Sequence, residues 1–134
     1  MRLWSLSDGT DGKCIAVLQS KMELVNSCAF SPDGNMLAVC GGQKHTLCLY
    51  TGKDLRFVTT FLGHIAEVSS CKFNSRGDIL VSASFDNTLR LWEMATHRCI
   101  MTLEVMFNMF DNHLTFIRVI QIEFMNVYSA PIIN

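Results

Sequence analysis

Apolar and polar residues alternate in three short runs between residues 63 and 92. The runs cover Glu67–Phe73, Ile79–Ser84 and Leu89–Trp92. The segments between them, Asn74–Gly77 and Asp86-Asn87, consist of residues that favour tight turns. Alternation with a period of about two over roughly four to eight residues is typical of half-buried strands. The stretch therefore predicts three short antiparallel strands.

The same pattern occurs earlier in the chain. An offset of 43 residues, falling to 42 near the end, superimposes the first copy on the second. The aligned pairs are Val25 with Val68, Cys28 with Cys71, Phe30 with Phe73, Gly34 with Gly77, Leu37 with Leu80, Leu47 with Leu89, and Tyr50 with Trp92. A period in the low forties indicates a four-stranded blade of a β-propeller.

The ends of the second copy carry a more specific signal. It opens with Gly63-His64 and its third strand ends at Trp92-Glu93, where the usual closing dipeptide is Trp-Asp. In these residues the chain resembles the WD-repeat family. The resemblance implies an all-β fold made of antiparallel four-stranded blades.

The repeat register divides the chain into four parts. Met1–Trp4 aligns with Leu89–Trp92, and Cys14–Leu18 aligns with the outer strand Cys99–Leu103. The expected parts are the second half of a blade at 1–19, a degenerate repeat at 20–62, a near-consensus repeat at 63–104 and an anomalous hydrophobic tail at 105–134. Closed propellers use about 4–8 blades. We therefore expect a partial propeller that cannot close and that self-associates or needs partner chains, because its edges and faces stay uncovered.

The tail lacks both a new Gly-His pair and a closing Trp. The stretch Leu114–Tyr128 is rich in Ile, Val and Phe, which favours strand, but the spacing of its polar residues also fits a helix, so both alternatives stay open. One place for the tail is over an exposed blade face, with Phe116, Val119 and Ile122 packing inward.

Four polar or aromatic residues of the near-consensus repeat are candidates for a structural network. In WD repeats the residues that match Trp92, Ser82, His64 and Asp86 form a hydrogen-bonded chain in that order, and the resemblance implies the same chain here. Ser84 is an alternative to Ser82, because both point to the same side of a regular strand. Such a network satisfies half-buried donors and acceptors and ties two loops together.

The degenerate repeat should lack this network. Lys21, Lys44 and Tyr50 stand where the near-consensus repeat has its His, Asp and Trp. We expect this repeat to fold as a blade without the polar chain.

Ser, His and Asp in one repeat also permit a remote alternative, a Ser-His-Asp hydrolase. No Gly-x-Ser-x-Gly motif surrounds either serine, and the serine falls within a strand, so we expect no enzyme and no catalytic residue. His45, His97 and His113 have no partner at metal-ligand spacing. The sequence therefore predicts neither a metal nor a cofactor.

Composition and charge narrow the environment. The chain has 134 residues, 49% hydrophobic and 17% charged, with a formal net charge of −1, so neither nucleic acid nor a membrane surface is an expected partner. No apolar run is long enough to span a bilayer, and the first residues lack the apolar core of a signal peptide. The six cysteines follow the repeat register, which indicates reduced, buried thiols and an intracellular protein, cytoplasmic or nuclear.

The expected function is that of a non-enzymatic scaffold or adaptor that binds proteins. The candidate binding residues are Phe85, which follows the second strand, with Glu67 and Arg90 around it; the alternative is that Phe85 packs against a neighbouring blade. A Gly/Asp-rich insertion at Ser5–Lys13, followed by a degenerate blade, also looks like part of the WD repeat and SOCS box-containing proteins. This resemblance implies a narrower role, substrate recognition for a cullin ubiquitin ligase, although no SOCS box is recognisable.

Overall fold

The computed structural model describes residues 1–5, 12–18, 24–41 and 45–105, which form ten strands in three antiparallel sheets. A two-stranded sheet contains β1 (Arg2–Ser5) and β2 (Lys13–Val17). A four-stranded sheet contains β3 (Ser27–Phe30), β4 (Met36–Gly41), β5 (Thr46–Thr51) and β6 (Arg56–Phe61). The other four-stranded sheet contains β7 (Val68–Phe73), β8 (Ile79–Ser84), β9 (Thr88–Glu93) and β10 (Arg98–Glu104).

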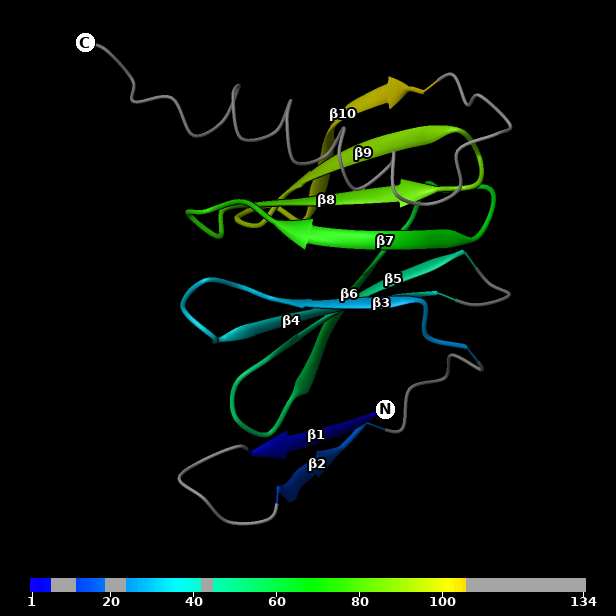
Figure 1. Ribbon diagram of the computed structural model, residues 1–134. Coiled ribbons are helices and arrows are strands. Elements are labelled where there is room, and N and C mark those ends of the chain that lie inside the picture. Colours follow the sequence, from blue (N-terminus) through cyan, green and yellow to red (C-terminus); the bar gives the residue numbers. More distant parts are fainter. Residues whose placement is uncertain (6–11, 19–23, 42–44, 106–134) are drawn as a thin grey trace, which may run out of the picture.

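Each four-stranded sheet is a simple meander in which sequence neighbours pair. The three sheets stack face to face, with β1–β2 at one end and β7–β10 at the other (Figure 1). The predicted all-β fold of partial propeller blades is confirmed, and the described sheets do not close into a ring or barrel. The described residues contain no helix that could cross a membrane.

The two four-stranded sheets share a buried core. The β3–β6 sheet contributes small and branched side chains, and the β7–β10 sheet contributes larger ones. Phe61 of β6 and Trp92 of β9 meet here, with ring centroids 5.1 Å apart. The core residues are Ala38, Cys40, Leu47, Leu49, Phe61, Val68, Cys71, Phe73, Leu80 and Trp92. Burial of this much apolar surface holds the two blades together.

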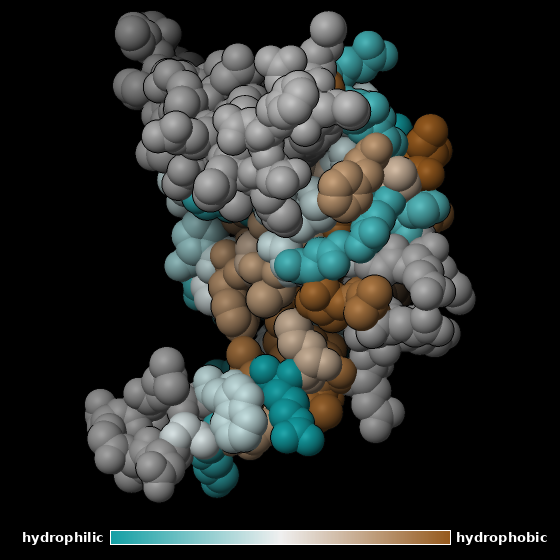
Figure 2. Space-filling model, turned by 45° about the vertical axis from the view of Figure 1, so that its right-hand side comes forward, coloured by the Kyte–Doolittle hydropathy of each residue, from teal (hydrophilic) through white to brown (hydrophobic). Residues whose placement is uncertain are grey.

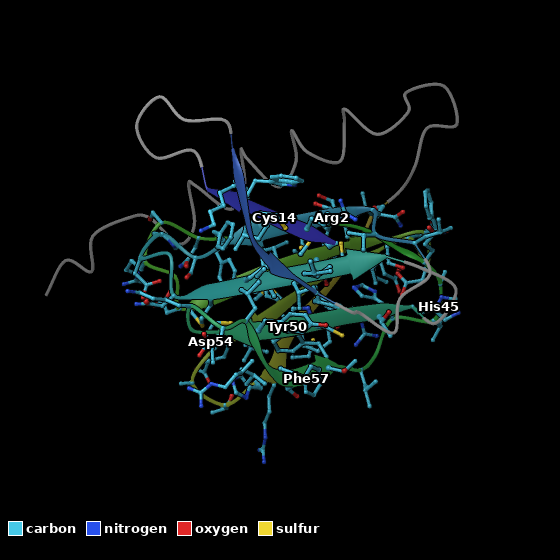
Figure 3. All side chains as sticks on the ribbon, turned by 90° about the horizontal axis from the view of Figure 1, so that it is seen from below. Arg2, Cys14, His45, Tyr50, Asp54 and Phe57 are labelled. Atoms are coloured by element: carbon cyan, nitrogen blue, oxygen red, sulfur yellow. The ribbon has the colours of Figure 1, made fainter. Side chains whose placement is uncertain are left out.

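The opposite face of the β3–β6 sheet packs on the β1–β2 hairpin. Tyr50, which replaces the Trp of the other repeat, is buried there and contacts Phe57 edge-to-face at 5.8 Å. Figure 3 views this side and shows Tyr50 and Phe57 on neighbouring strands beside the hairpin. The cluster is otherwise apolar: Leu37, Val39, Cys48 and Leu55, with Met1, Leu3, Ala16 and Leu18 against it. The degenerate blade therefore has an apolar cluster where its neighbour has a polar network.

The expectation that the repeat-register cysteines are buried is wrong for one of them. All six cysteines are free thiols, as predicted, but Cys28 is exposed whereas its repeat partner Cys71 is buried. The reason is that β7 packs against β3 and β4, while the β1–β2 hairpin packs on side chains of β4 and β5 and leaves β3 open. Cys14 and Cys99, on the outer strands, are only half-buried.

Several predictions fall outside the described residues. They are the conformation of the tail beyond residue 105, the state of His113, and most of the Gly/Asp-rich insertion.

Phe73 and Phe30 occupy equivalent positions with opposite burial, so they form a matched pair. Phe73 is 6% exposed and Phe30 is 47% exposed. We expect Phe73→Ala to lower the free energy of unfolding by about 3–5 kcal/mol, as is usual for a buried Phe, and Phe30→Ala to cost distinctly less. Urea titrations of the two variants measure both values, and equal losses would contradict the packing asymmetry.

Candidate functional site

The candidate site lies at the end of the β7–β10 sheet where two loops meet. His64 follows β6, and Asp86 lies in the tight turn between β8 and β9. Ser82 of β8 and Trp92 of β9 point to the same face of the sheet, towards the core shared with the β3–β6 sheet. Because alternate residues of a strand share a face, Ser84 points to this side as well.

The structure joins the four predicted residues in one hydrogen-bonded chain. Trp92 Nε1 donates to Ser82 Oγ at 2.8 Å. Ser82 Oγ lies 2.7 Å from His64 Nε2, and His64 Nδ1 lies 2.8 Å from Asp86 Oδ2. The indole can only donate and the ionised carboxylate can only accept, so every proton along the chain points from Trp92 towards Asp86.

This direction fixes the protonation state of His64. Its Nδ1 carries the proton donated to Asp86, and its unprotonated Nε2 accepts from the Ser82 hydroxyl, so the imidazole is neutral. Burial lowers the pKa of His64 below its usual value, although the neighbouring Asp86 carboxylate acts in the opposite direction. A charged imidazole would turn a second donor towards Ser82 and leave the hydroxyl proton without this acceptor.

Asp86 is the point at which the two loops are held together. Its Oδ2 also accepts from the backbone N–H of Ile65 at 3.1 Å. Its Oδ1 accepts from the N–H of Thr88 at 2.9 Å and from Thr88 Oγ1 at 2.6 Å. Burial raises the pKa of Asp86, but the hydrogen bonds from Thr88, His64 and Ile65 outweigh it and lower the pKa to about 2. The carboxylate is therefore ionised at neutral pH.

Ser84 does not replace Ser82 but makes a second tie between the same loops. Its hydroxyl donates to the carbonyl of Ala66 at 3.0 Å and accepts from the N–H of Asp86 at 3.1 Å. The N–H of Phe85 donates to the carbonyl of Glu67 at 2.9 Å. Both residues next to the turn are thus fixed to the segment before β7.

The geometry does not suit hydrolysis. Ser82 has no exposed surface, and its oxygen contacts both Trp92 Nε1 and His64 Nε2. A nucleophile must reach its substrate, and this oxygen has no free approach. In the described part of the chain no group of three His, Cys, Asp or Glu residues could hold a metal ion.

Two apolar side chains project from the loops that Asp86 joins. Phe85 is 60% exposed and Ile65 is 82% exposed. In Figure 1 both loops lie at the right-hand end of the sheets, and Figure 2 turns this end forward to show hydrophobic residues among hydrophilic ones. Glu67 is half-buried beside them and its Oε1 accepts from Asn26 Nδ2 at 2.6 Å. The network therefore presents a small apolar surface with an acidic neighbour.

The third predicted binding residue, Arg90, is placed elsewhere. Its guanidinium lies against Gly63, where an added Cβ would clash with Nη1, and close to the Trp92 ring. Arg90 faces the same side of the sheet as Trp92, and its Nε is buried without a hydrogen bond. The contacts described for Arg90 are thus with the buried network side and not with Phe85.

Sequence reasoning missed two participants. Thr88 caps Asp86 with both its N–H and its hydroxyl, and a Thr two residues after an Asp in a turn was a signal for such an Asx-type contact. Asn26 links the two blades by donating to Glu67 and to the carbonyl of Val68. It lies in the other repeat, and the register alone gave no sign of this contact.

Comparison with known proteins gives the same register. The family model described as "WD domain, G-beta repeat" matches residues 12–51 and 55–93. One of the subunits of chromatin assembly factor 1 from Mus musculus is 28% identical over 71% of this chain and 21% of its own length. WD repeat, SAM and U-box domain-containing protein 1 of Danio rerio is 37% identical over 61% of this chain and 17% of its own length. The chain spans about a fifth of the length of these relatives.

Stacked four-stranded meanders with a hydrogen-bonded Trp, Ser, His and Asp define the class as β-propeller repeat proteins. With the family model matching more than half of its residues, the chain belongs to the WD-repeat family.

Removal of either end of the network should destabilise the β7–β10 sheet. We expect Trp92→Phe and His64→Ala each to lower the free energy of unfolding by about 1–3 kcal/mol, because a buried partner is left unsatisfied. Tyr50→Phe should cost less, since Tyr50 lies in the apolar cluster of the degenerate blade. Urea melts compare the three, and a Tyr50→Phe loss as large as that of Trp92→Phe would refute a single intact network.

The network should also make stability fall in acid. His64 has a lowered folded pKa, so its contribution is complete above the usual value of 6.5 and is lost as the pH falls below it. The Asp86 contribution is present above 3.8 and is lost as the pH falls towards about 2. We expect His64→Gln to remove the decline that begins near pH 6.5, and Asp86→Asn to remove the decline below 3.8. Urea midpoints measured across this range test both, and unchanged profiles would contradict the assignment.

Proposed function

We propose that this chain is a non-enzymatic protein-interaction scaffold that binds a partner through Phe85 and Ile65. The observation that carries the proposal is that one carboxylate fixes both loops: Asp86 follows Phe85 directly and accepts from the N–H of Ile65. Both side chains are exposed although they are large and apolar. Exposed apolar residues on a rigid frame favour a binding role.

Rigidity makes these residues effective contacts. An aromatic side chain on a loop that is already ordered loses little conformational entropy on binding. Phe85 is held through its N–H to Glu67, and its neighbour Asp86 is held through Thr88 and His64. Glu67 adds an acidic group beside the apolar pair, which favours a partner with apolar side chains next to a basic residue.

The partner and its setting are proposals. WD-repeat relatives whose names place them in a chromatin assembly factor and in a translation initiation factor support a role within an intracellular assembly. The chain is far shorter than these relatives. We infer that it acts with further blades or partner chains, as its open strand β3 also suggests.

Substitution of Phe85 tests the proposal. Proteins captured from cell extract by the full chain are identified, and the affinity of a purified partner is then measured for Phe85→Ala and Ile65→Ala. We expect Phe85→Ala to weaken binding about 30-fold or more, the effect of a residue worth about 2 kcal/mol. Phe57→Ala is the matched control, because Phe57 is 59% exposed but lies on β6.

Circular dichroism of each variant separates binding from folding. Unchanged affinity of a folded Phe85→Ala variant would remove Phe85 from the site. Loss of fold together with affinity would favour the alternative that Phe85 packs within the protein.

A narrower second candidate is substrate recognition for a cullin ubiquitin ligase. It is supported by the Gly/Asp-rich insertion before the degenerate blade and by a relative whose name includes a U-box. The same capture experiment distinguishes the two. A cullin recovered with both wild type and Phe85→Ala, together with a substrate lost from the variant, would favour the ligase role.

A further inference from the structure

The outward face of the β7–β10 sheet is apolar at five positions of its central strands. Ile79, Val81 and Ala83 of β8 and Leu89 and Leu91 of β9 form one cluster. This face is opposite to the one that carries Ser82 and Trp92. In the β3–β6 sheet the equivalent face is the one that packs on the next blade. The repeat therefore builds this face to be covered.

The described residues supply only a small part of that cover. Each of the five side chains is 9% exposed or less. Among the described residues, Val105 is the one recorded from outside this sheet in contact with the cluster. Its N–H donates to the carbonyl of Asn87 at 2.8 Å, which extends the β9–β10 pairing by one residue and places Val105 at the edge of the face.

We propose that residues 106–134 fold back over this face as an intramolecular cap, in the place where a further blade would pack. The segment begins at the edge of the cluster, directly after Val105. It contains 29 residues (134 minus 105), and an extended chain advances about 3.3 Å per residue. It is therefore long enough to cross six-residue strands more than once.

The chemistry of the segment fits the face. It is rich in Phe, Ile, Met and Val, and its charged residues are Asp111, Arg118 and Glu123. An apolar segment next to an apolar face lowers the surface that both expose to water when they pack together. An intramolecular cover also needs no second molecule, so it is favoured over association at low concentration.

The cap goes beyond the proposed scaffold function because it decides which surfaces stay available. A covered outer face cannot receive another blade or a second copy. The loops that present Phe85 and Ile65 lie at the end of the sheet, and a cap on its face leaves them free. The cap would stand or fall independently of the Phe85 site.

Photo-crosslinking in the full chain tests the cap. Benzoylphenylalanine is introduced at Phe116, and equal amounts of isotopically light and heavy chains are mixed, irradiated and analysed by peptide mass spectrometry. We expect crosslinks from position 116 to peptides within residues 79–91 of the same chain. The control places the probe at Phe57 on β6, which should give no crosslink to residues 79–91.

Other outcomes overturn the proposal. Crosslinks to residues 79–91 that join light and heavy chains would mean that a second copy covers the face. No crosslink, or crosslinks only to other sheets, would mean that the segment lies elsewhere.

A second variant guards against a passive contact. Val119→Asp should abolish the crosslinks and raise the fluorescence of an added hydrophobic dye, whereas Asn126→Asp should leave both unchanged. Crosslinks and dye fluorescence that survive Val119→Asp would also overturn the cap.

Discussion

The neutral imidazole of His64, held between Asp86 and Ser82, is the constraint on which the order of this end of the molecule depends. Its two nitrogens have opposite roles, so the buried ring accepts from a serine on one side and donates to a carboxylate on the other. The loop before β7, strand β8 and the β8–β9 turn can satisfy it only together. Burial and the lowered pKa of His64 are therefore part of the same arrangement, because a charged ring would break the direction of the chain.

The two repeats show that a blade can form with or without this polar chain. In the β3–β6 sheet Val39 takes the place of Ser82, Tyr50 takes the place of Trp92, and the surrounding side chains are apolar. Both sheets have the same meander and nearly the same strand lengths. The blade itself thus follows from alternation and apolar packing, while the polar chain adds the fixed geometry of two loops. A rigid loop pair is useful for recognition rather than for folding.

Most of the fold could be predicted from period and alternation, because strand pairing in a meander is local and turn residues mark each reversal. The four network residues were predictable from the family resemblance. The distinct roles of Ser82 and Ser84 were not, since both point to one side of β8 and only their depth differs. Arg90 was placed beside Phe85 because the two are near in sequence, yet its guanidinium lies against Gly63 on the network side of the sheet. The exposure of Cys28 escaped prediction because a repeat register assumes equal neighbours, and β3 lacks the neighbour that β7 has.

The location of the network decides which properties need a complete ring. His64, Ser82, Asp86 and Trp92 all lie within one repeat, and the neighbouring blade contributes packing through Phe61 and a loop contact through Asn26. Two adjacent blades therefore contain every described contact that positions Phe85 and Ile65. Ring closure would add cover to β3 and to the outer face of the β7–β10 sheet, but it would add no described hydrogen bond to Asp86. Binding through these loops is thus separable from the number of blades, whereas solubility and self-association depend on how the two open faces are covered.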